Sequence, residues 1–192
     1  MNILPYLSML GIDKPDQFAE VYNQTIEKLE HVDVKSLNFN PLVVFKSLLY
    51  FSKLHPEFIA PKVELVFSKI RDYYLDFRQA NPPKIKNALQ TEIYKQLREK
   101  FPDRNFQEET TIDEWDLIFT DIVDKENKIV IEVDGQHHFL FNDESKRTGI
   151  DRFQERLIEL YGYKVRRISV EKYNKLTEEE KAKLLTEIIQ IK

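Results

Sequence analysis

The chain contains no cysteine among its 192 residues. Neither a disulfide framework nor a thiolate metal site is available, so any metal ion must be held by oxygen and imidazole ligands, which favours a hard divalent ion. No apolar run approaches the roughly 20 residues of a membrane-spanning helix. The N-terminal residues lack the basic flank and small-residue cleavage site of a signal peptide. We therefore expect an intracellular protein with no membrane partner.

The chain also has little net charge, −4 at pH 7. This argues weakly against a polyanionic partner, because neutralising phosphates is the main source of non-specific nucleic-acid affinity. The charges are nevertheless unevenly distributed: residues 84–143 contain 8 Lys/Arg and 14 Asp/Glu, whereas residues 144–192 contain 12 and 9. This pattern fits either a metal site beside a phosphate-binding surface or two solvated faces.

The first part of the chain is predicted to be helical. Apolar residues recur at spacings of three and four in residues 13–32, 40–58 and 60–83, and prolines open the second and third of these segments. The third segment carries an aromatic stripe that includes Phe67 and Phe77. We interpret this stripe as core rather than as a platform for stacked bases, because aromatics at helical spacing are usually buried.

The remaining residues alternate between helix and strand. We predict a helix over 84–101, strands at 114–122, 127–135 and 163–170, an amphipathic helix between the last two strands, and a capped helix from Thr177. A strand, helix and strand in succession indicate a parallel pair. The sequence therefore predicts an α/β fold, with a mixed sheet flanked by helices, preceded by an all-α N-terminal segment.

Acidic residues in the predicted strands suggest a metal site. Side chains alternate along a strand, so Glu132 and Asp134 share one face, and Asp116 lies in the strand before. If those strands are neighbours, Asp116 and Glu132 project into one pocket. Their mutual repulsion is then relieved by a divalent cation such as Mg²⁺.

The residues after this strand add to the cluster. Gly135 permits a turn or a close backbone approach, and His137 or His138 follows as a candidate base or ligand. Each of these residues also has an ordinary explanation, since single strand carboxylates usually face solvent and paired histidines are usually packed or surface residues. Only their combination makes a functional site as plausible as a structural one.

These motifs resemble the RAP domain, a module at the C-terminus of organellar and bacterial RNA-associated proteins that is regarded as a variant of the restriction-endonuclease-like PD-(D/E)XK fold. The similarity covers about residues 84–176. The matching residues are Glu132, Asp134, Gly135, His138 and Phe139, then Leu157, Gly162, Tyr163 and Val165, then Tyr173, Asn174, Lys175 and Leu176. The segment also resembles very-short-patch repair endonucleases, whose D-x-x-R element corresponds to Asp151 with Arg152 or Arg156.

The resemblance implies action on RNA as a metal-dependent endoribonuclease. Single-stranded DNA is an alternative partner. Asp116, Glu132 and the Val133 carbonyl would hold Mg²⁺ or Mn²⁺. Asp134 would orient water or bind a second ion, and His138 would transfer protons. Because Asp134 stands where the endonuclease motif has lysine, the alternative is a catalytically inactive RNA-binding module. A protein-interaction scaffold is a further alternative.

The resemblance also suggests supporting residues and a domain boundary. Glu92 is an additional candidate carboxylate, with an exposed helix face as the alternative location. Residues 1–83 form a helical segment, as a remnant of RNA-binding repeats or as a packing or self-association element, and residues 84–192 form the RAP-like domain with its C-terminal helix. The residues predicted to guide the nucleic-acid backbone are Lys146, Arg147, Arg152, Arg156, Arg166 and Arg167.

Overall fold

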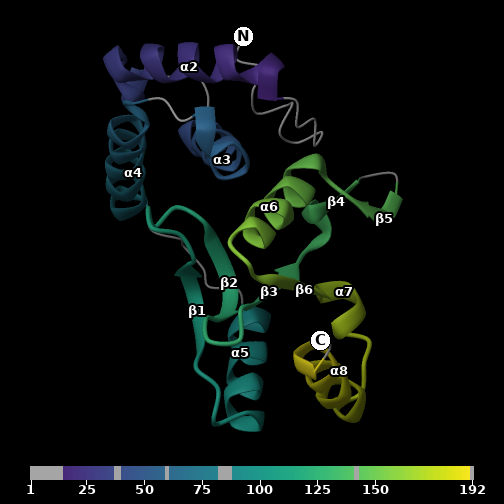
Figure 1. Cartoon of the computed structure of the whole chain (residues 1–192). Helices are drawn as coiled ribbons and strands as arrows, with labels where there is room; N and C mark the ends of the chain where they lie inside the picture. Colours follow the sequence, from purple (N-terminus) through teal and green to yellow (C-terminus); the bar gives the residue numbers. More distant parts are fainter. Residues whose placement is uncertain (1–14, 37–39, 59–60, 82–87, 141–142, 191–192) are drawn as a thin grey trace. The chain divides into compact units, whose positions relative to one another are not determined.

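The computed structural model describes residues 15–36, 40–58, 61–81, 88–140 and 143–190 (Figure 1). The chain divides into two compact units. We call Met1–Lys84 with Asp113–Ile118 the helical unit, and Ile85–Ile112 with Phe119–Lys192 the sheet unit. None of the helices in the described ranges combines the length and the apolar character that a bilayer crossing needs.

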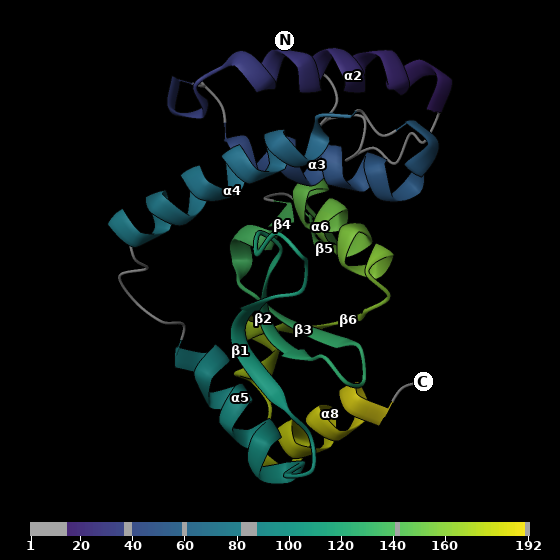
Figure 2. The ribbon, with the colours of Figure 1, turned by 60° about the vertical axis from the view of Figure 1, so that its left-hand side comes forward.

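The helical unit contains the helices that the apolar spacing predicts. They are α2 (Pro15–His31), α3 (Pro41–Leu54) and α4 (Val63–Ala80), with short 3₁₀ turns η1 (Val34–Ser36) and η2 (Pro56–Phe58). Both α2 and α3 contact α4 (Figure 2). Helix α3 begins where expected, because the Asn40 side chain accepts the backbone N–H of Leu42 at 3.0 Å and Pro41 occupies the first turn.

The aromatic stripe of α4 is only partly core. Phe67 is buried, and its ring lies 4.9 Å from that of Phe45 and 5.4 Å from that of Trp115, measured between centroids. Phe77, in contrast, is 49% exposed near the end of the helix. The interpretation of the stripe as core is therefore right for its first turns and wrong for Phe77.

The segment before the second strand is a loop rather than the predicted start of a strand. The buried carboxylate of Asp113 accepts the backbone N–H groups of Trp115 at 3.2 Å, Leu117 at 3.0 Å and Ile118 at 2.7 Å. These donors are consequently not available for pairing with a neighbouring strand. Asp116 within this loop has a positive φ of 58°. The prediction that Asp116 lies in a strand is wrong.

The sheet unit contains a four-stranded mixed sheet, in the order β1-β2-β3-β6. Its strands are β1 (Phe106–Thr111), β2 (Phe119–Asp124), β3 (Ile129–Asp134) and β6 (Lys164–Ser169). Strand β2 is antiparallel to both β1 and β3, whereas β3 and β6 are parallel and are joined through α6 (Gly149–Leu160). The predicted α/β class, the mixed sheet and the parallel pair are confirmed.

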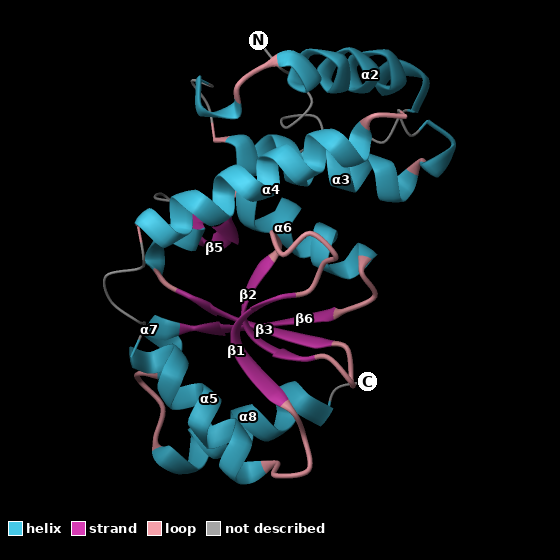
Figure 3. Cartoon of the chain, turned by 90° about the vertical axis from the view of Figure 1, so that its left-hand side faces the viewer, coloured by secondary structure: helices cyan, strands magenta, loops and turns pink. Residues whose placement is uncertain are grey.

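Helices cover both faces of this sheet (Figure 3). Helix α6 lies on one face, and α5 (Ala88–Lys100) and α8 (Glu178–Gln190) lie on the other. Ile129, Ile131 and Val133 belong to the core cluster shared with α5 and α8. Alternation therefore turns both Glu132 and Asp134 toward the α6 face, so the prediction that they share one face is confirmed.

The helix ends follow the sequence signals. Helix α6 stops before Gly162, whose φ of 78° is readily adopted by glycine. Helix α8 starts with the predicted capping box. Glu180 accepts the backbone N–H of Thr177 at 2.8 Å, and Thr177 Oγ1 accepts that of Glu180 at 3.3 Å. These signals fix where α6 ends before β6 and where α8 begins.

Some elements of the sheet unit were not predicted. They are the edge strand β1, the short hairpin of β4 (Phe139–Leu140) with β5 (Asp143–Arg147), the turn η3 (Gln136–His138) and the short helix α7 (Val170–Tyr173). Strand β1 reads FQEETT and has one buried residue, Phe106. A strand on the sheet edge needs few apolar side chains, so its sequence gives a weak signal.

Candidate nucleic-acid interface

The candidate site lies where the parallel strands β3 and β6 end side by side. Asp134 pairs with Ser169 at the last position of this ladder. Strand β3 continues into η3 and β6 continues into α7, so both segments leave the sheet at the carboxyl ends of these two strands. In α/β proteins the carboxyl ends of parallel strands are the usual location of ligand sites, because the outgoing loops can close around a ligand.

A partly buried ion-pair network joins the ends of these strands to α6 and β5. Arg167 of β6 donates to Asp134 Oδ1 at 2.6 Å and to Glu155 Oε2 on α6 at 3.2 Å. Asp134 is 3% exposed and Arg167 16%. Arg147 of β5 also pairs with Glu155, and both burial and the neighbouring charge of Arg167 lower the pKa of Arg147. The charges of these four residues are thus largely compensated within the fold.

His138 is fixed beside this network. Its Nδ1 lies 2.7 Å from Asp151 Oδ1 and 3.9 Å from Asp134 Oδ1. Asp151 is itself held by Thr148, the N-cap residue of α6, whose hydroxyl donates to Asp151 Oδ2 and accepts the Asp151 backbone N–H. The backbone N–H of Thr148 also donates to the carbonyl of His138 at 3.0 Å. The imidazole therefore has a defined orientation.

A further carboxylate, Asp121 of β2, reaches this region. Its Oδ2 accepts the backbone N–H of Val133 at 2.7 Å. Ile122 pairs with Ile131, so Asp121 lies opposite Glu132 one position beyond the last ladder pair. Burial raises the pKa of the Asp121 carboxyl; the negative charge of Asp134 raises it further, whereas His138 lowers it.

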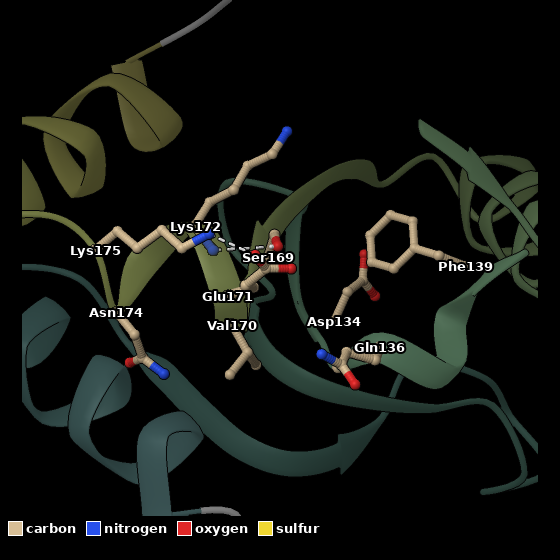
Figure 4. Close-up of a pocket in the computed structure, with 10 residues that line it drawn as sticks. Asp134, Gln136, Phe139, Ser169, Val170, Glu171, Lys172, Asn174 and Lys175 are labelled. Carbon is tan, nitrogen blue, oxygen red and sulfur yellow. Dashed lines mark hydrogen bonds and ion pairs between the residues drawn. The ribbon is translucent and has the colours of Figure 1, made fainter. Parts of the chain in front are cut away.

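A pocket of about 420 Å³ opens beside Asp134 (Figure 4). Its lining residues come from the two turns that leave the sheet: Asp134, Gly135, Gln136, Phe139, Ser169, Val170, Glu171, Lys172, Asn174 and Lys175. Phe139 lies on one side, and the α7 residues Val170 and Glu171 lie on the other. The pocket thus combines an aromatic ring, side-chain amides and ammonium groups.

A comparison with known families finds a similarity in this region. Residues 131–188 match the family model of the RAP domain. We call this span the RAP segment; it runs from β3 into α8 and includes every residue that lines the pocket. RAP domains are generally RNA-binding modules. No curated protein matches the chain.

The carboxylates predicted around the RAP segment have different surroundings. Asp116 is exposed in the helical unit, 3.7 Å from Arg71. Glu92 is exposed on α5, where it accepts from Gln96 at 3.1 Å, and α5 covers the face opposite α6. Glu132 is half-buried and Asp134 is bonded by Arg167.

Asp121 is the carboxylate that sequence reasoning missed. The predicted site needs an acidic residue from the strand before β3 beside Glu132, and the sequence suggests Asp116 for that position. The signal for Asp121 was a charged residue within the apolar run of 117–123, where most neighbours are buried. A charge at such a position needs a partner, and Asp121 finds one in the backbone of Val133.

The predicted basic residues whose side chains are described have different surroundings. Arg147 and Arg167 belong to the ion-pair network, whereas Arg166 points to the other face and donates to the Ile188 carbonyl at 3.3 Å. Arg152 is exposed on α6 and Arg156 is half-buried. The side chains of Lys146 and His137 lie outside the described residues.

The described side chains do not form a complete metal cage. Across those ranges, no group of three or more His, Asp or Glu residues is placed to hold an ion. Arg167 already bonds Oδ1 of Asp134, so this carboxylate would have only its second oxygen for an ion or a water molecule. Asp121 and Glu132 fit better, since Mg²⁺ in phosphoryl-transfer sites often uses one or two carboxylates and takes its other oxygens from water and substrate.

Proposed function

We propose that the chain binds RNA through the RAP segment, at the pocket beside the ends of β3 and β6. The family match over the residues that build this pocket carries the proposal. The negative net charge of the chain is compatible with it, because binding depends on the local arrangement of cations rather than on the total. We also propose that the sheet unit is a variant of the restriction-endonuclease-like fold, supported by its mixed sheet and crossover helix.

The cations best placed to meet phosphates are the lysines of the pocket. Lys172 is exposed, and the Lys175 side chain is 70% exposed and pairs with Glu171 at 2.5 Å. An exposed ion pair of this kind is worth only about 0 to 1 kcal/mol, so a phosphate can readily compete for the ammonium group. Arg147 and Arg167 are less suitable, because carboxylates already neutralise them inside the fold.

RNA retention as a function of salt tests this proposal. We expect the full chain to bind a labelled single-stranded RNA at about 50 mM salt and to bind it more weakly at about 200 mM. Replacing Lys172 or Lys175 by alanine should each reduce the slope of log affinity against log salt by about 1. Lys183→Ala is the matched control, since Lys183 on α8 is 77% exposed but does not line the pocket.

The possible outcomes separate the alternatives. An unchanged slope in both lysine variants, with binding intact, would place the RNA elsewhere on the chain. No retention of RNA at low salt would contradict the proposal and would favour a protein-interaction scaffold.

A specific observation supports a second candidate function, metal-dependent RNA hydrolysis. Carboxylates of neighbouring strands, Asp121 and Glu132, lie on the α6 face of the sheet near His138. They would hold Mg²⁺ or Mn²⁺ together with the Val133 carbonyl, and the ion would supply an activated water and offset phosphate charge. His138, oriented by Asp151, is the residue suited to carry a proton.

This second function has its own test. Labelled RNA should be cleaved with Mn²⁺ and left intact with a chelator, and Asp121→Asn and Glu132→Gln should abolish cleavage without loss of RNA binding. Direct titration of Mn²⁺ should show weaker ion binding in both variants. Asp116→Asn is the control and should remain active. RNA binding with no cleavage in any metal would support the binding module alone.

A further inference from the structure

We infer that the pocket receives one unpaired nucleotide of an RNA single strand, with its base stacked on Phe139. This inference rests on the proposed RNA-binding function and adds the form of RNA that is recognised. The pocket volume of about 420 Å³ suits a single small ligand, since small-molecule sites span about 300 to 1,000 Å³. A base that remains paired and stacked within a duplex has no exposed face to present to it.

The chemistry of the walls matches a nucleotide. An aromatic ring such as that of Phe139 stacks on any base, because every base has a π-face. Gln136 and Asn174 line the same pocket, and each amide carries both a donor and an acceptor for the edge of an unpaired base. Lys172 and Lys175 on the α7 side supply cations for the adjoining phosphates.

The acidic residues of the pocket do not oppose this ligand. Asp134 is neutralised by Arg167 at 2.6 Å and is 3% exposed. Glu171 pairs with Lys175, and this hydrogen bond holds the pKa of Glu171 below its ordinary value. Both carboxylates therefore face the pocket as members of ion pairs, and the lysine of the second pair is exposed to an incoming phosphate.

The backbone that carries the Phe139 ring is also held in place before any ligand arrives. The backbone N–H of Phe139 donates to the Gln136 carbonyl, and Phe139 pairs with Arg147 in the β4–β5 hairpin. Arg147 is in turn tied to Glu155 on α6. A preformed wall reduces the entropy lost on binding, so a single stacked base can contribute to affinity.

Fluorescence polarisation with a labelled strand of about 12 nucleotides tests the inference, with the same sequence as a duplex for comparison. We expect the full chain to prefer the single strand. Phe139→Ala should weaken single-strand binding about 5-fold to 150-fold and leave duplex binding unchanged. Phe77→Ala is the control, because Phe77 is 49% exposed on α4 and does not line the pocket.

A second variant keeps the test valid if the alanine substitution disturbs folding. The chain has one tryptophan, Trp115. In a Trp115→Phe background, Phe139→Trp should retain single-strand binding, and the new indole fluorescence should be quenched when the strand is added. Unchanged fluorescence with the strand bound would show that no base stacks at this position.

The remaining outcomes distinguish this inference from the function on which it rests. Equal binding of duplex and single strand, unaffected by Phe139→Ala, would overturn nucleotide insertion and leave RNA binding intact. Failure to bind either RNA would overturn the proposed function itself. If AMP or UMP alone bound as tightly as the strand, the ligand would be a free nucleotide and the inference of a strand-bound nucleotide would be wrong.

Discussion

Removing Arg167 should destabilise the sheet unit more than removing any other single cation of the RAP segment. The Arg167→Met substitution leaves the Asp134 carboxylate without the donor that lies 2.6 Å away. Asp134 is 3% exposed, so water cannot replace that donor. Methionine retains much of the side-chain volume, which limits the change to the charge and the hydrogen bonds.

The expected loss in the free energy of unfolding depends on the partners that remain for the carboxylates of Asp134 and Glu155. Breaking a buried ion pair by removing one partner costs about 3 to 5 kcal/mol. Glu155 keeps Arg147 as a partner, whereas the imidazole of His138 stays 3.9 Å from Asp134, beyond hydrogen-bond distance. We therefore expect a loss of about 3 kcal/mol, near the lower end of the range.

The companion substitutions sharpen this expectation. Asp134→Asn should cost less, about 1 to 3 kcal/mol, because Arg167 still has Glu155 at 3.2 Å. The double variant should be more stable than Arg167→Met alone, because the buried carboxylate is then replaced by a neutral amide. Arg152→Met is the control; Arg152 is exposed on α6, and its loss should change stability by less than about 0.5 kcal/mol.

Urea unfolding followed by far-ultraviolet circular dichroism at pH 7 measures these differences. A loss below about 1 kcal/mol for Arg167→Met, or a double variant no more stable than it, would refute the reasoning. Either result would mean that solvent reaches Asp134 and that the network does not organise the ends of β3 and β6.

Three further predictions concern single residues. The stability of Asp121→Asn relative to wild type should rise as pH rises from about 3 to 7. The raised pKa of Asp121 means that its ionisation destabilises the wild-type fold, whereas asparagine cannot ionise. Urea midpoints of both proteins across this pH range measure the stability difference, and a difference that stays flat or falls with pH contradicts the prediction. Thr177→Ala should cost about 1 kcal/mol by removing the capping box of α8, whereas an unchanged melting temperature would contradict a stabilising cap. Asp113→Ala should cost about 1 to 3 kcal/mol, since three backbone N–H groups lose their acceptor, and protection of these amides from hydrogen exchange should fall.

The sequence was most informative where periodicity and capping act together. Helix α3 begins at the proline that the sequence indicates, Pro41, and helix α8 begins directly after the predicted cap residue Thr177. Alternation in β3 also predicts correctly which side chains share a face, because Ile129, Ile131 and Val133 all pack in the core cluster with α5 and α8. These features depend on local pattern, so they can be read without knowing the partners.

The start of β2 could not be read in this way. Residues 114–118 have the apolar and aromatic composition of a strand, but Asp113 captures their N–H groups through its side chain. Asx-type capture of this kind competes with strand pairing, and alternation alone does not show which one prevails. The acidic residue that lies in β2 beside Glu132 is therefore Asp121 and not, as the sequence suggests, Asp116.

Charge pairing limited the site prediction for a similar reason. A sequence shows which residues are charged, whereas the fold decides which charges cancel. Arg167, which the sequence suggests as an RNA-guiding residue, pairs with Asp134 across adjacent strands and with Glu155 across the sheet and helix layers. The exposed cations beside the pocket are instead Lys172 and Lys175, which total charge did not distinguish from other surface lysines. In the proposed RNA complex, the charges of the ion-pair network are already compensated, so contacts to phosphates would fall to the exposed lysines that solvent can reach.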